Sequence, residues 1–362
     1  MKIVFVVDDY SGGAGNIIQL LSTEYAKMDE VYVLLTHQTS DKRYECLNVK
    51  FHELSANKKP SGALKKVLFQ IRWLKNEIKE IQPDVVISFL TINNIFIGLG
   101  QLHSKLPIIS CERICPSDLS LKFPWNLLMN VAYWRADMIT VQFSEFTSLY
   151  NGKYEDKCAV TPNYIAKPDR FKSVSDSNEK RRLISCGRLN ASKQFDVMLE
   201  MFSEIHRRNP DTELFIYGRG PYEEQLRKRI DELGLSDAAF LKGYTNDTYG
   251  VLCDSDIYLM SSKSEGFPNA LSEALAVGLP SVAFRCNPGI DELSDYGRRC
   301  AVIDVGDRQA FMEAVLDLCA NTERSVEYSK NAKEVTKVYS LDKVKKSWDD
   351  CIESAIKNKQ GR

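Results

Sequence analysis

Two carboxylates in the second half of the chain, Glu265 and Glu273, have the type and spacing of a ligand-binding pair. They stand eight residues apart on either side of Gly266, where the backbone can come close to a ligand. The apolar pattern predicts a helix over 269–277, and a carboxylate near its start is favoured by the helix dipole by about 0.3–1 kcal/mol. That explanation covers Glu273. Glu265 precedes the helix in a loop with no apparent partner, so it is the stronger candidate for a functional group.

Two cations, Arg188 and Lys193, lie between an expected strand over 182–186 and an expected helix over 195–207. A diphosphate carries about two negative charges, and fixed Arg and Lys donors beside a helix N-terminus form a good receptor for it. A pair of solvated surface cations is the alternative, and the spacing alone does not separate the two.

The order of strand, glycine turn and helix occurs three times in this half, at Gly187, Gly218 and Gly266. Because the carboxyl ends of parallel strands meet at one edge of a sheet, we expect these turns to lie where a ligand binds. Carboxylates beside a diphosphate would repel it unless they face neutral hydroxyls. We therefore expect Glu265 and Glu273 to accept hydrogen bonds from sugar or ribose hydroxyls, while cations and backbone N–H groups hold the phosphates.

Both halves alternate apolar strands with helical patterns, which is typical of parallel sheets covered on both faces. The expected fold class is therefore α/β, with two doubly wound domains. The expected strands cover residues 3–7, 31–35, 84–89, 108–116, 138–141 and 159–163, then 182–186, 213–217, 239–241, 257–260, 281–284 and 301–305, with further helices over 61–82 and 221–233 and a long terminal helix broken near Ser340.

The first strand runs into a glycine turn that includes Gly13, which could admit an anion at the start of the next helix. A plain tight turn explains it equally well. The dinucleotide-binding fingerprint is incomplete, because Ile18 takes the third glycine position. The second strand ends in Thr36 and His37, with no acid there to hold a ribose.

Length and composition predict a globular protein of two domains. A net charge of −1 gives no general affinity for nucleic acid. The ten cysteines have no metal-ligand spacing and are read as reduced thiols. The N-terminus reads as a first strand without a signal peptide, and no apolar run could span a membrane, so a cytoplasmic location is expected. The expected divisions are 1–165, a linker over 166–181, 182–339, and 340–362 packing back on the first domain.

Two segments of the first half raise the question of a membrane surface. The helix over 61–82 is amphipathic and rich in lysine and arginine, and residues 121–134 are apolar and aromatic. Both could contact an anionic bilayer. A solvated helix of an α/β layer is the better supported alternative for the first, and core packing for the second.

Glu265 and Glu273 with Gly266-Phe267-Pro268 between them form an E-x7-E signature. Around it stand Gly187-Arg188-Leu189 with Lys193, a Gly218-x-Gly-Pro turn and similar runs over 243–262 and 288–293. This combination resembles the retaining glycosyltransferases of family 4, which have the GT-B fold of two Rossmann-like domains facing across a cleft. The resemblance covers the second half, with looser agreement at Gly12-Gly13 and 161–163.

The resemblance implies roles for residues of the donor site. Arg188 and Lys193 would neutralise the donor diphosphate, Glu273 would hold the ribose, and Glu265 with the backbone that follows it would hold the transferred sugar. The implied donor-binding set is Gly13, Gly187, Arg188, Lys193, Gly218, Tyr244, Glu265, Gly266, Phe267, Pro268, Asn269 and Glu273.

The first domain departs from the family pattern. Where many members place a histidine beside the sugar, this chain has Cys111-Glu112-Arg113, similar to a variant in enzymes of bacterial capsule and exopolysaccharide synthesis. Glu112 and Arg113 are therefore candidates for catalytic, acceptor or donor contacts. Asp254 and Asp256 have the spacing of a metal motif but lie where the family has a structural turn, so a metal-independent reaction is expected.

The implied reaction is transfer of a hexose or N-acetylhexosamine, with retention, from a nucleotide-diphosphate sugar that we expect to be UDP-linked. The expected acceptor is an oligosaccharide or a polyprenyl-linked glycan in surface polysaccharide synthesis, which suggests peripheral association with the inner membrane. The alternatives are a GT-B nucleotide-sugar epimerase, a phosphorylase and a non-catalytic module that binds nucleotide sugar.

Overall fold

The computed structural model describes residues 1–8, 12–37, 48–55, 60–150, 152–174 and 180–360 of the 362. The chain divides into two compact units, each with its own sheet. Unit 1 comprises Met1–Asn163 and Asp342–Arg362, and unit 2 comprises Tyr164–Leu341. Among the described residues, no helix has both the length and the apolar character needed to cross a bilayer.

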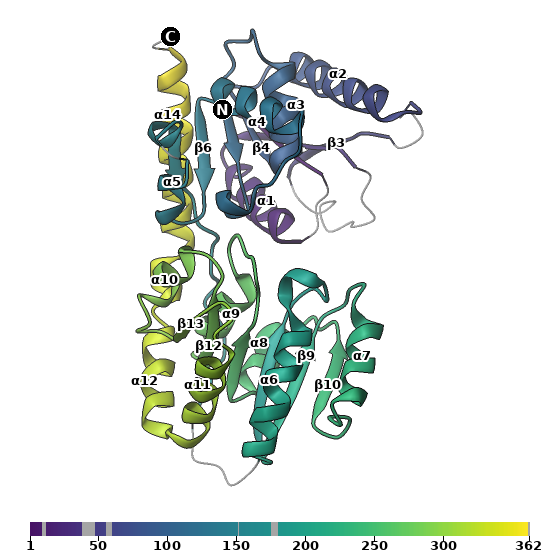
Figure 1. Cartoon of the computed structure of the whole chain (residues 1–362). Helices are drawn as coiled ribbons and strands as arrows, with labels where there is room; N and C mark the ends of the chain where they lie inside the picture. Colours follow the sequence, from purple (N-terminus) through teal and green to yellow (C-terminus); the bar gives the residue numbers. More distant parts are fainter. Residues whose placement is uncertain (9–11, 38–47, 56–59, 151, 175–179, 361–362) are drawn as a thin grey trace. The chain divides into compact units, whose positions relative to one another are not determined.

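Unit 1 contains a seven-stranded parallel sheet in the order β3-β2-β1-β4-β5-β6-β7 (Figure 1). Its elements are β1 (Lys2–Val7), α1 (Gly12–Tyr25), β2 (Glu30–Leu35), β3 (Lys50–Glu53), α2 (Ala63–Ile81), β4 (Val85–Phe89), α3 (Thr91–Gly100), β5 (Ile108–Cys111), η3 (Pro116–Asp118), α4 (Trp125–Arg135), β6 (Met138–Val141), α5 (Glu145–Ser148), η4 (Glu155–Lys157), β7 (Cys158–Val160) and α14 (Leu341–Gln360).

The inner strands of unit 1 are mostly apolar because both faces of a parallel sheet are covered, whereas the edge strand β3 is polar. β1 and β4 are almost completely buried. The strand order reverses between them, and ligands of doubly wound sheets bind at the carboxyl ends of the strands at such a point. Four elements differ from the sequence expectation. The strand expected over 108–116 ends at Cys111, the one expected over 159–163 is the short β7, and β3 and α3 were not anticipated.

The terminal helix α14 packs on unit 1. Trp348 is fully buried and stacks on Phe89 with 5.8 Å between ring centroids. The Tyr25 hydroxyl donates to Asp349 over 2.8 Å. These contacts join two stretches that lie more than three hundred residues apart in the sequence.

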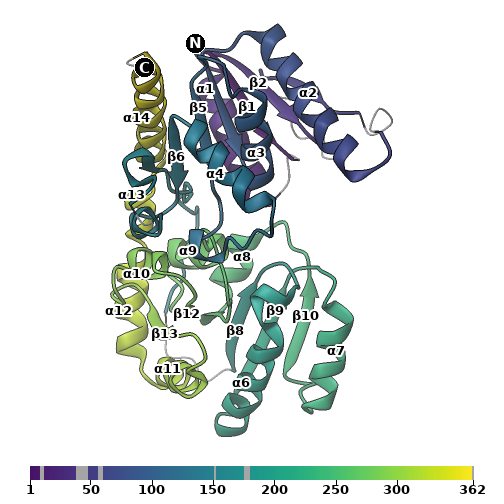
Figure 2. The same ribbon diagram turned by 45° about the horizontal axis from the view of Figure 1, so that its top comes forward.

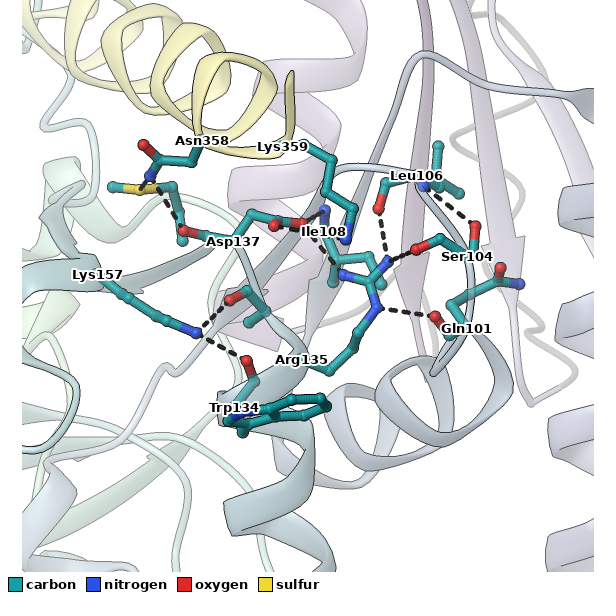
Figure 3. A network of polar contacts seen from close by, with 12 residues as sticks. Gln101, Ser104, Leu106, Ile108, Trp134, Arg135, Asp137, Lys157, Asn358 and Lys359 are labelled. Atoms are coloured by element: carbon teal, nitrogen blue, oxygen red, sulfur yellow. Dashed lines mark hydrogen bonds and ion pairs between the residues drawn. The ribbon is translucent and has the colours of Figure 1, made fainter. Parts of the chain in front are cut away.

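A buried ion pair also holds α14 and the middle strands of unit 1 together (Figure 3). The Arg135 guanidinium donates to the carbonyls of Gln101, Ser104 and Leu106 over 2.7–2.9 Å and lies 3.2 Å from Asp137. Asp137 also accepts from the Ile108 N–H over 3.0 Å. Lys359 of α14 lies 3.8 Å from the second oxygen of Asp137. The pair therefore fixes the loop that leads into β5.

Unit 2 contains a six-stranded parallel sheet in the order β10-β9-β8-β11-β12-β13 (Figure 2). Its elements are β8 (Arg181–Cys186), η5 (Ala191–Lys193), α6 (Phe195–Arg208), β9 (Thr212–Tyr217), α7 (Glu223–Glu232), β10 (Ala239–Gly243), α8 (Thr248–Cys253), β11 (Ile257–Met260), α9 (Asn269–Val277), β12 (Ser281–Arg285), α10 (Gly289–Ser294), β13 (Ala301–Asp304), α11 (Arg308–Ala320), α12 (Thr322–Ala332) and α13 (Val335–Val338).

The hydrophobic core of unit 2 lies between its sheet and the helices α6, α7 and α11, whose apolar faces share one cluster. The helix expected over 221–233 begins two residues later, because Pro221 and Tyr222 form a turn. α9 has the expected bounds and ends at Gly278 in a left-handed conformation. The stretch expected as a linker makes contacts inside unit 2, where the Lys172 N–H donates to the Val277 carbonyl over 2.8 Å.

We predict that Arg135→Met destabilises unit 1 by about 3–5 kcal/mol, because the buried Asp137 carboxylate loses its closer cation and keeps only Lys359 at 3.8 Å, and because three carbonyls lose their donor. Urea unfolding followed by far-ultraviolet circular dichroism measures the effect. Arg207→Met is the matched control, since Arg207 pairs with Glu204 on the exposed surface of α6, and it should leave the unfolding midpoint unchanged. Equal unfolding curves for Arg135→Met and the wild type would contradict this view of the pair.

Candidate functional site

The candidate site of unit 2 lies where the strand order of its sheet reverses, between β8 and β11. The loop after β8 carries Arg188 and Lys193, and the loop after β11 carries Glu265. A backbone hydrogen bond joins the two loops, from the Lys263 N–H to the Ser192 carbonyl over 2.8 Å. The topology therefore brings together residues that lie more than seventy positions apart in the sequence.

Lys193 and Glu265 form an ion pair at this point, with 2.5 Å between Nζ and Oε1. The Ser262 hydroxyl donates to the same Oε1 over 2.6 Å. Both charged side chains are mostly buried. The expectation that Glu265 has no partner was therefore wrong. The second carboxylate oxygen, Oε2, has no hydrogen bond to any residue in the described part of the chain.

Further polar contacts fix the backbone of both partners. The Ser261 hydroxyl lies within hydrogen-bond distance of the carbonyls of Lys193, at 2.8 Å, and Gln194, at 3.1 Å. Gln194 has a φ of 50°, which turns the chain into α6. The Asn287 amide donates to the Glu265 carbonyl over 2.7 Å. Sequence reasoning missed these side chains, because serine and asparagine after strands carry no distinctive spacing.

Arg188 differs from Lys193 in being exposed and unpaired. It has no hydrogen bond or ion pair to any residue that the structure describes. Its guanidinium is consequently available to an anion, and Arg188 lies five residues before the Lys193 ion pair. The site thus holds one cation already neutralised by a carboxylate and one that is free.

Glu273 is the fifth residue of α9 and lies beyond the first turn. Its carboxylate has no hydrogen bond or ion pair within the described ranges, and burial raises its pKa to about 7. A helix dipole would lower the pKa instead, so the dipole explanation offered by the sequence does not account for this residue. An unpaired, partly buried carboxylate with a raised pKa is typical of a functional site.

The glycines of the expected turns serve the close packing of the loops. Gly218 has a φ of 147°, and a Cβ there would lie 1.8 Å from the Gly187 carbonyl oxygen. A Cβ on Gly220 would lie 2.2 Å from the Leu189 carbonyl oxygen. A Cβ on Gly187 would press on the Lys193 side chain at 3.1 Å. Any larger residue at Gly218 or Gly220 would therefore push the Arg188 loop away from its neighbour.

The remaining expected donor residues of unit 2 lie at the same carboxyl edge. Tyr244 follows β10 and is 66% exposed. Gly266 and Pro268 lead into α9, which begins at Asn269, and no side chain caps its N-terminus. Phe267 is buried and packs edge-on against Tyr339 with ring centroids 5.7 Å apart.

Gly13, Glu112 and Arg113 belong to unit 1. Gly13 is the second residue of α1. Glu112 is buried and accepts from Thr91 and Asn94, each over 2.8 Å, and burial raises its pKa.

Arg113 is also buried, beside the stacked rings of Phe89 and Trp348, whose centroids lie 5.2 and 5.3 Å from its guanidinium carbon, and it donates to the Thr161 carbonyl over 3.0 Å. Glu112 and Arg113 therefore both contact residues of unit 1, although the buried Nε of Arg113 has no hydrogen-bond partner in the described part of the chain.

Asp254 and Asp256 form ion pairs with basic residues of unit 2. Their spacing is that of a metal motif. Asp254 pairs with Arg170. Asp256 pairs with Lys172 at 2.9 Å and accepts from the Arg182 N–H over 2.8 Å. In the described residues, no group of three or more potential metal ligands comes together.

Comparison with known proteins places this geometry in context. Residues 167–335, which make up most of unit 2, match the family described as glycosyl transferases group 1. An uncharacterized glycosyltransferase of Haemophilus influenzae is 26% identical over 83% of this chain and 84% of its own length. A Campylobacter jejuni protein is 24% identical over 94% of this chain and 96% of its own, and is named N-acetylgalactosamine-N,N'-diacetylbacillosaminyl-diphospho-undecaprenol 4-alpha-N-acetylgalactosaminyltransferase.

Among solved structures, Anabaena HepE in complex with UDP and glucose superimposes with a TM-score of 0.84 at 16% identity, covering 98% of this chain and 100% of that one. The expected α/β class, with two Rossmann-like parallel-sheet domains of the GT-B type, is confirmed.

We predict that Glu273→Gln stabilises the protein by on the order of 3 kcal/mol at pH 8 and by no more than about 1 kcal/mol at pH 5. The folded carboxyl has a pKa of about 7 against an ordinary value of 4.5. Between these values the native state binds more protons than the unfolded chain, so the stability of the wild type falls as the pH rises.

Urea unfolding at both pH values measures this difference. Glu224→Gln is the control, because Glu224 is exposed on α7 and should show no dependence on pH. An equal difference between Glu273→Gln and the wild type at pH 5 and pH 8 would show that burial does not raise this pKa.

Proposed function

We propose that the chain is a glycosyltransferase that transfers a hexose or N-acetylhexosamine from a UDP sugar to a lipid-linked glycan, with retention at the anomeric carbon. The observation that carries the proposal is the group of side chains at the carboxyl edge of unit 2. There Lys193 is paired with Glu265, while Arg188 and Glu273 have no partner among the residues that the structure describes.

Arg188 and Lys193 are the proposed receptor for the donor diphosphate. The leaving group gains negative charge as the sugar departs, and fixed cations stabilise that charge most in the transition state. Arg188 can approach the phosphates without giving up a partner. Lys193 can contact a phosphate oxygen while its ammonium still donates to Glu265, since it has three N–H donors.

Glu265 is the proposed receptor for the transferred sugar. Lys193 and Ser262 both donate to Oε1, which leaves Oε2 to accept from a sugar hydroxyl. The pairing also lowers the repulsion between the carboxylate and the incoming diphosphate. The Ser262 hydroxyl would thus keep the Glu265 carboxylate in the same orientation when Lys193 also contacts a phosphate.

Glu273 is the proposed receptor for the ribose hydroxyls of the donor. An unpaired carboxylate accepts hydrogen bonds from two neighbouring hydroxyls well, and the hydroxyls replace the water lost on burial. The UDP bound to the Anabaena neighbour supports uridine diphosphate as the carrier. The proposed donor set also includes Gly13, Tyr244 and the backbone from Gly266 to Asn269.

In the proposed step, the bond from the anomeric carbon to the diphosphate oxygen breaks and a bond to the acceptor oxygen forms. The acceptor hydroxyl loses its proton to the departing diphosphate, so the atoms and charges balance without another reactant. Retention is proposed from the resemblance to family 4. The α-linkage in the name of the Campylobacter jejuni relative is consistent with it.

The proposed acceptor is a glycan on a polyprenyl diphosphate carrier. The name of the Campylobacter jejuni relative places its acceptor on diphospho-undecaprenol, which supports this class. We further propose that the protein works in the synthesis of a bacterial surface polysaccharide. Glu112 would position the acceptor site indirectly, because it holds the first turn of α3. Arg113 would do so through its contact with Trp348 of α14.

We predict that Lys193→Met lowers kcat about 100- to 1,000-fold, because one fixed donor to the developing charge is lost. Transfer is measured with a panel of UDP and GDP sugars and a polyprenyl-diphosphate-linked N-acetylhexosamine. Lys228→Met is the control, since Lys228 is exposed on α7.

The same assay separates the alternatives. Release of an epimeric nucleotide sugar without acceptor would indicate an epimerase, and dependence on inorganic phosphate a phosphorylase. Donor binding without turnover would indicate a binding module. Any of these results, or full activity of Lys193→Met, would contradict the proposal.

Peripheral association with an anionic membrane is proposed from unit 1. The first turns of α2 expose Leu64 and Leu68, which are 72% and 46% accessible, next to Lys65 and Lys66. Around α4, Phe123 and Trp134 are exposed by 79% and 63%. Apolar side chains beside lysines suit the interface of a bilayer with negative headgroups. Other apolar residues of the two helices, such as Leu74 and Ile78 of α2 and Leu128 and Met129 of α4, pack on the core of unit 1, while Leu127 of α4 is 56% exposed.

We predict that the double variant Leu64→Ser/Leu68→Ser binds vesicles with about 30% phosphatidylglycerol at least about tenfold more weakly than the wild type, because two apolar side chains no longer enter the bilayer. Sedimentation with the vesicles measures binding. Met28→Ser is the control, since Met28 is 92% exposed in the turn after α1. Equal binding of the double variant and the wild type would reject α2 as the contact.

A further inference from the structure

A second carboxylate site lies in unit 1, outside the residues assigned above. The strand order of unit 1 reverses between β1 and β4, and ligands of doubly wound sheets bind at the carboxyl ends of such strands. Asp8 directly follows β1, Thr36 directly follows β2, and Asn93 lies in the first turn of α3, which follows β4. Three segments distant in sequence thus bring polar side chains to this edge of the sheet.

The Asp8 carboxylate is held in one orientation by two buried donors. Its Oδ1 accepts from the Thr36 hydroxyl over 2.9 Å and from the Asn93 amide over 3.1 Å. Thr36 and Asn93 are both completely buried. Backbone bonds from the Thr36 N–H to the Val7 carbonyl, 3.0 Å, and from the His37 N–H to the Asp8 carbonyl, 2.8 Å, fix the main chain on either side.

The turn that carries Asn93 is itself rigid. Leu90, which precedes α3, has a φ of 74°, a strained conformation for a residue with a side chain. Glu112 accepts from Thr91 and Asn94 on the same turn, each over 2.8 Å. The Asn93 amide also donates to the Phe89 carbonyl over 3.0 Å. Buried contacts therefore fix the Asn93 amide, which in turn holds the Asp8 carboxylate.

Thr36 and Asn93 do not depend on Asp8 alone for a hydrogen-bond partner. The Thr36 hydroxyl also lies 3.3 Å from the Asn93 side-chain oxygen, so these two residues can bond to each other. The Asp8 side chain is 37% accessible, and Oδ2 has no partner among the residues that the structure describes. His37 lies beside it, with its Nδ1 3.7 Å from Oδ1, and is 56% accessible. Oδ1 thus accepts from two buried side chains, whereas Oδ2 is unpartnered within the described ranges.

We propose that Asp8 binds a hydroxyl of the acceptor sugar through Oδ2, an inference that rests on the proposed glycosyl transfer. A carboxylate only accepts hydrogen bonds, so its partner is a hydroxyl or an amide N–H and not a phosphate. The acceptor sugar is the neutral, hydroxyl-rich part of the substrates. His37 stands where it can contact a neighbouring group of the same sugar.

The test uses octyl α-N-acetylglucosaminide and octyl α-N-acetylgalactosaminide as acceptor probes. Their binding to the full chain is measured by calorimetry, with UDP as a separate titrant. At least one of the glycosides should bind to the wild type. The affinity of Asp8→Asn for that glycoside should be at least about tenfold lower, because a charged hydrogen bond is lost. UDP affinity and the thermal unfolding temperature should stay unchanged.

The control is Asp84→Asn. Asp84 precedes β4 and accepts from the Lys2 N–H over 2.7 Å, at the opposite end of the same sheet. It should bind the glycosides as the wild type does. A wild type that binds neither glycoside, or an Asp8→Asn variant with wild-type affinity, would overturn the proposal. Failure to bind UDP would instead overturn the proposed donor, while glycoside binding still decides the role of Asp8.

A second pair of variants covers the case in which Asp8→Asn does not fold. Thr36→Val keeps the volume of the side chain and removes one donor to Asp8. It should raise the KM for the acceptor several-fold with little change in the KM for the donor, and Thr36→Ser should restore the wild-type value. Equal changes in both KM values would indicate a general loss of structure and contradict the assignment.

Discussion

The pairing of Lys193 with Glu265 is the interaction on which the candidate site depends. It joins the loops on either side of the strand reversal in unit 2 and gives both a single arrangement. An isolated carboxylate would repel a diphosphate, and an isolated ammonium half buried in a loop would lose hydration. Paired, the two charges keep the site close to neutral before a ligand arrives, and Arg188 supplies the remaining positive charge.

Burial raises the pKa of Glu273, the other glutamate of the E-x7-E signature. Glu273 has no cation beside it in the described part of the chain, and its raised pKa reflects that lack. Such a group destabilises the native state at neutral pH, which is understandable where a ligand supplies the missing hydrogen bonds. The two glutamates thus have opposite environments, one compensated by the protein and the other left for a ligand.

Much of the fold could be predicted from the sequence, because buried parallel strands read as apolar runs and α9 is closed by a glycine. The strand β3 and the first residue of α7 were harder to predict from the sequence. β3 is an edge strand with little apolar content, and Pro221 begins a turn where it could equally have begun a helix.

The cations and acids of the site could also be found from the sequence, because their spacing after strands is regular. What the sequence could not supply was the set of contacts between segments. The bonds of Lys193 to Glu265 and of Thr36 to Asp8 arise only when separate loops meet. The burial of Glu112 and Arg113 follows from the packing of β5 beside α3 and α14, which no local pattern encodes.

The most direct test of the donor site is a calorimetric comparison of UDP with uridine at neutral pH and low salt. If Arg188 and Lys193 form the receptor for the diphosphate, UDP should bind at least about a hundredfold more tightly than uridine, and added salt should reduce the difference. Equal affinity for UDP and uridine would contradict the account, since it would mean that these cations do not bind the phosphates.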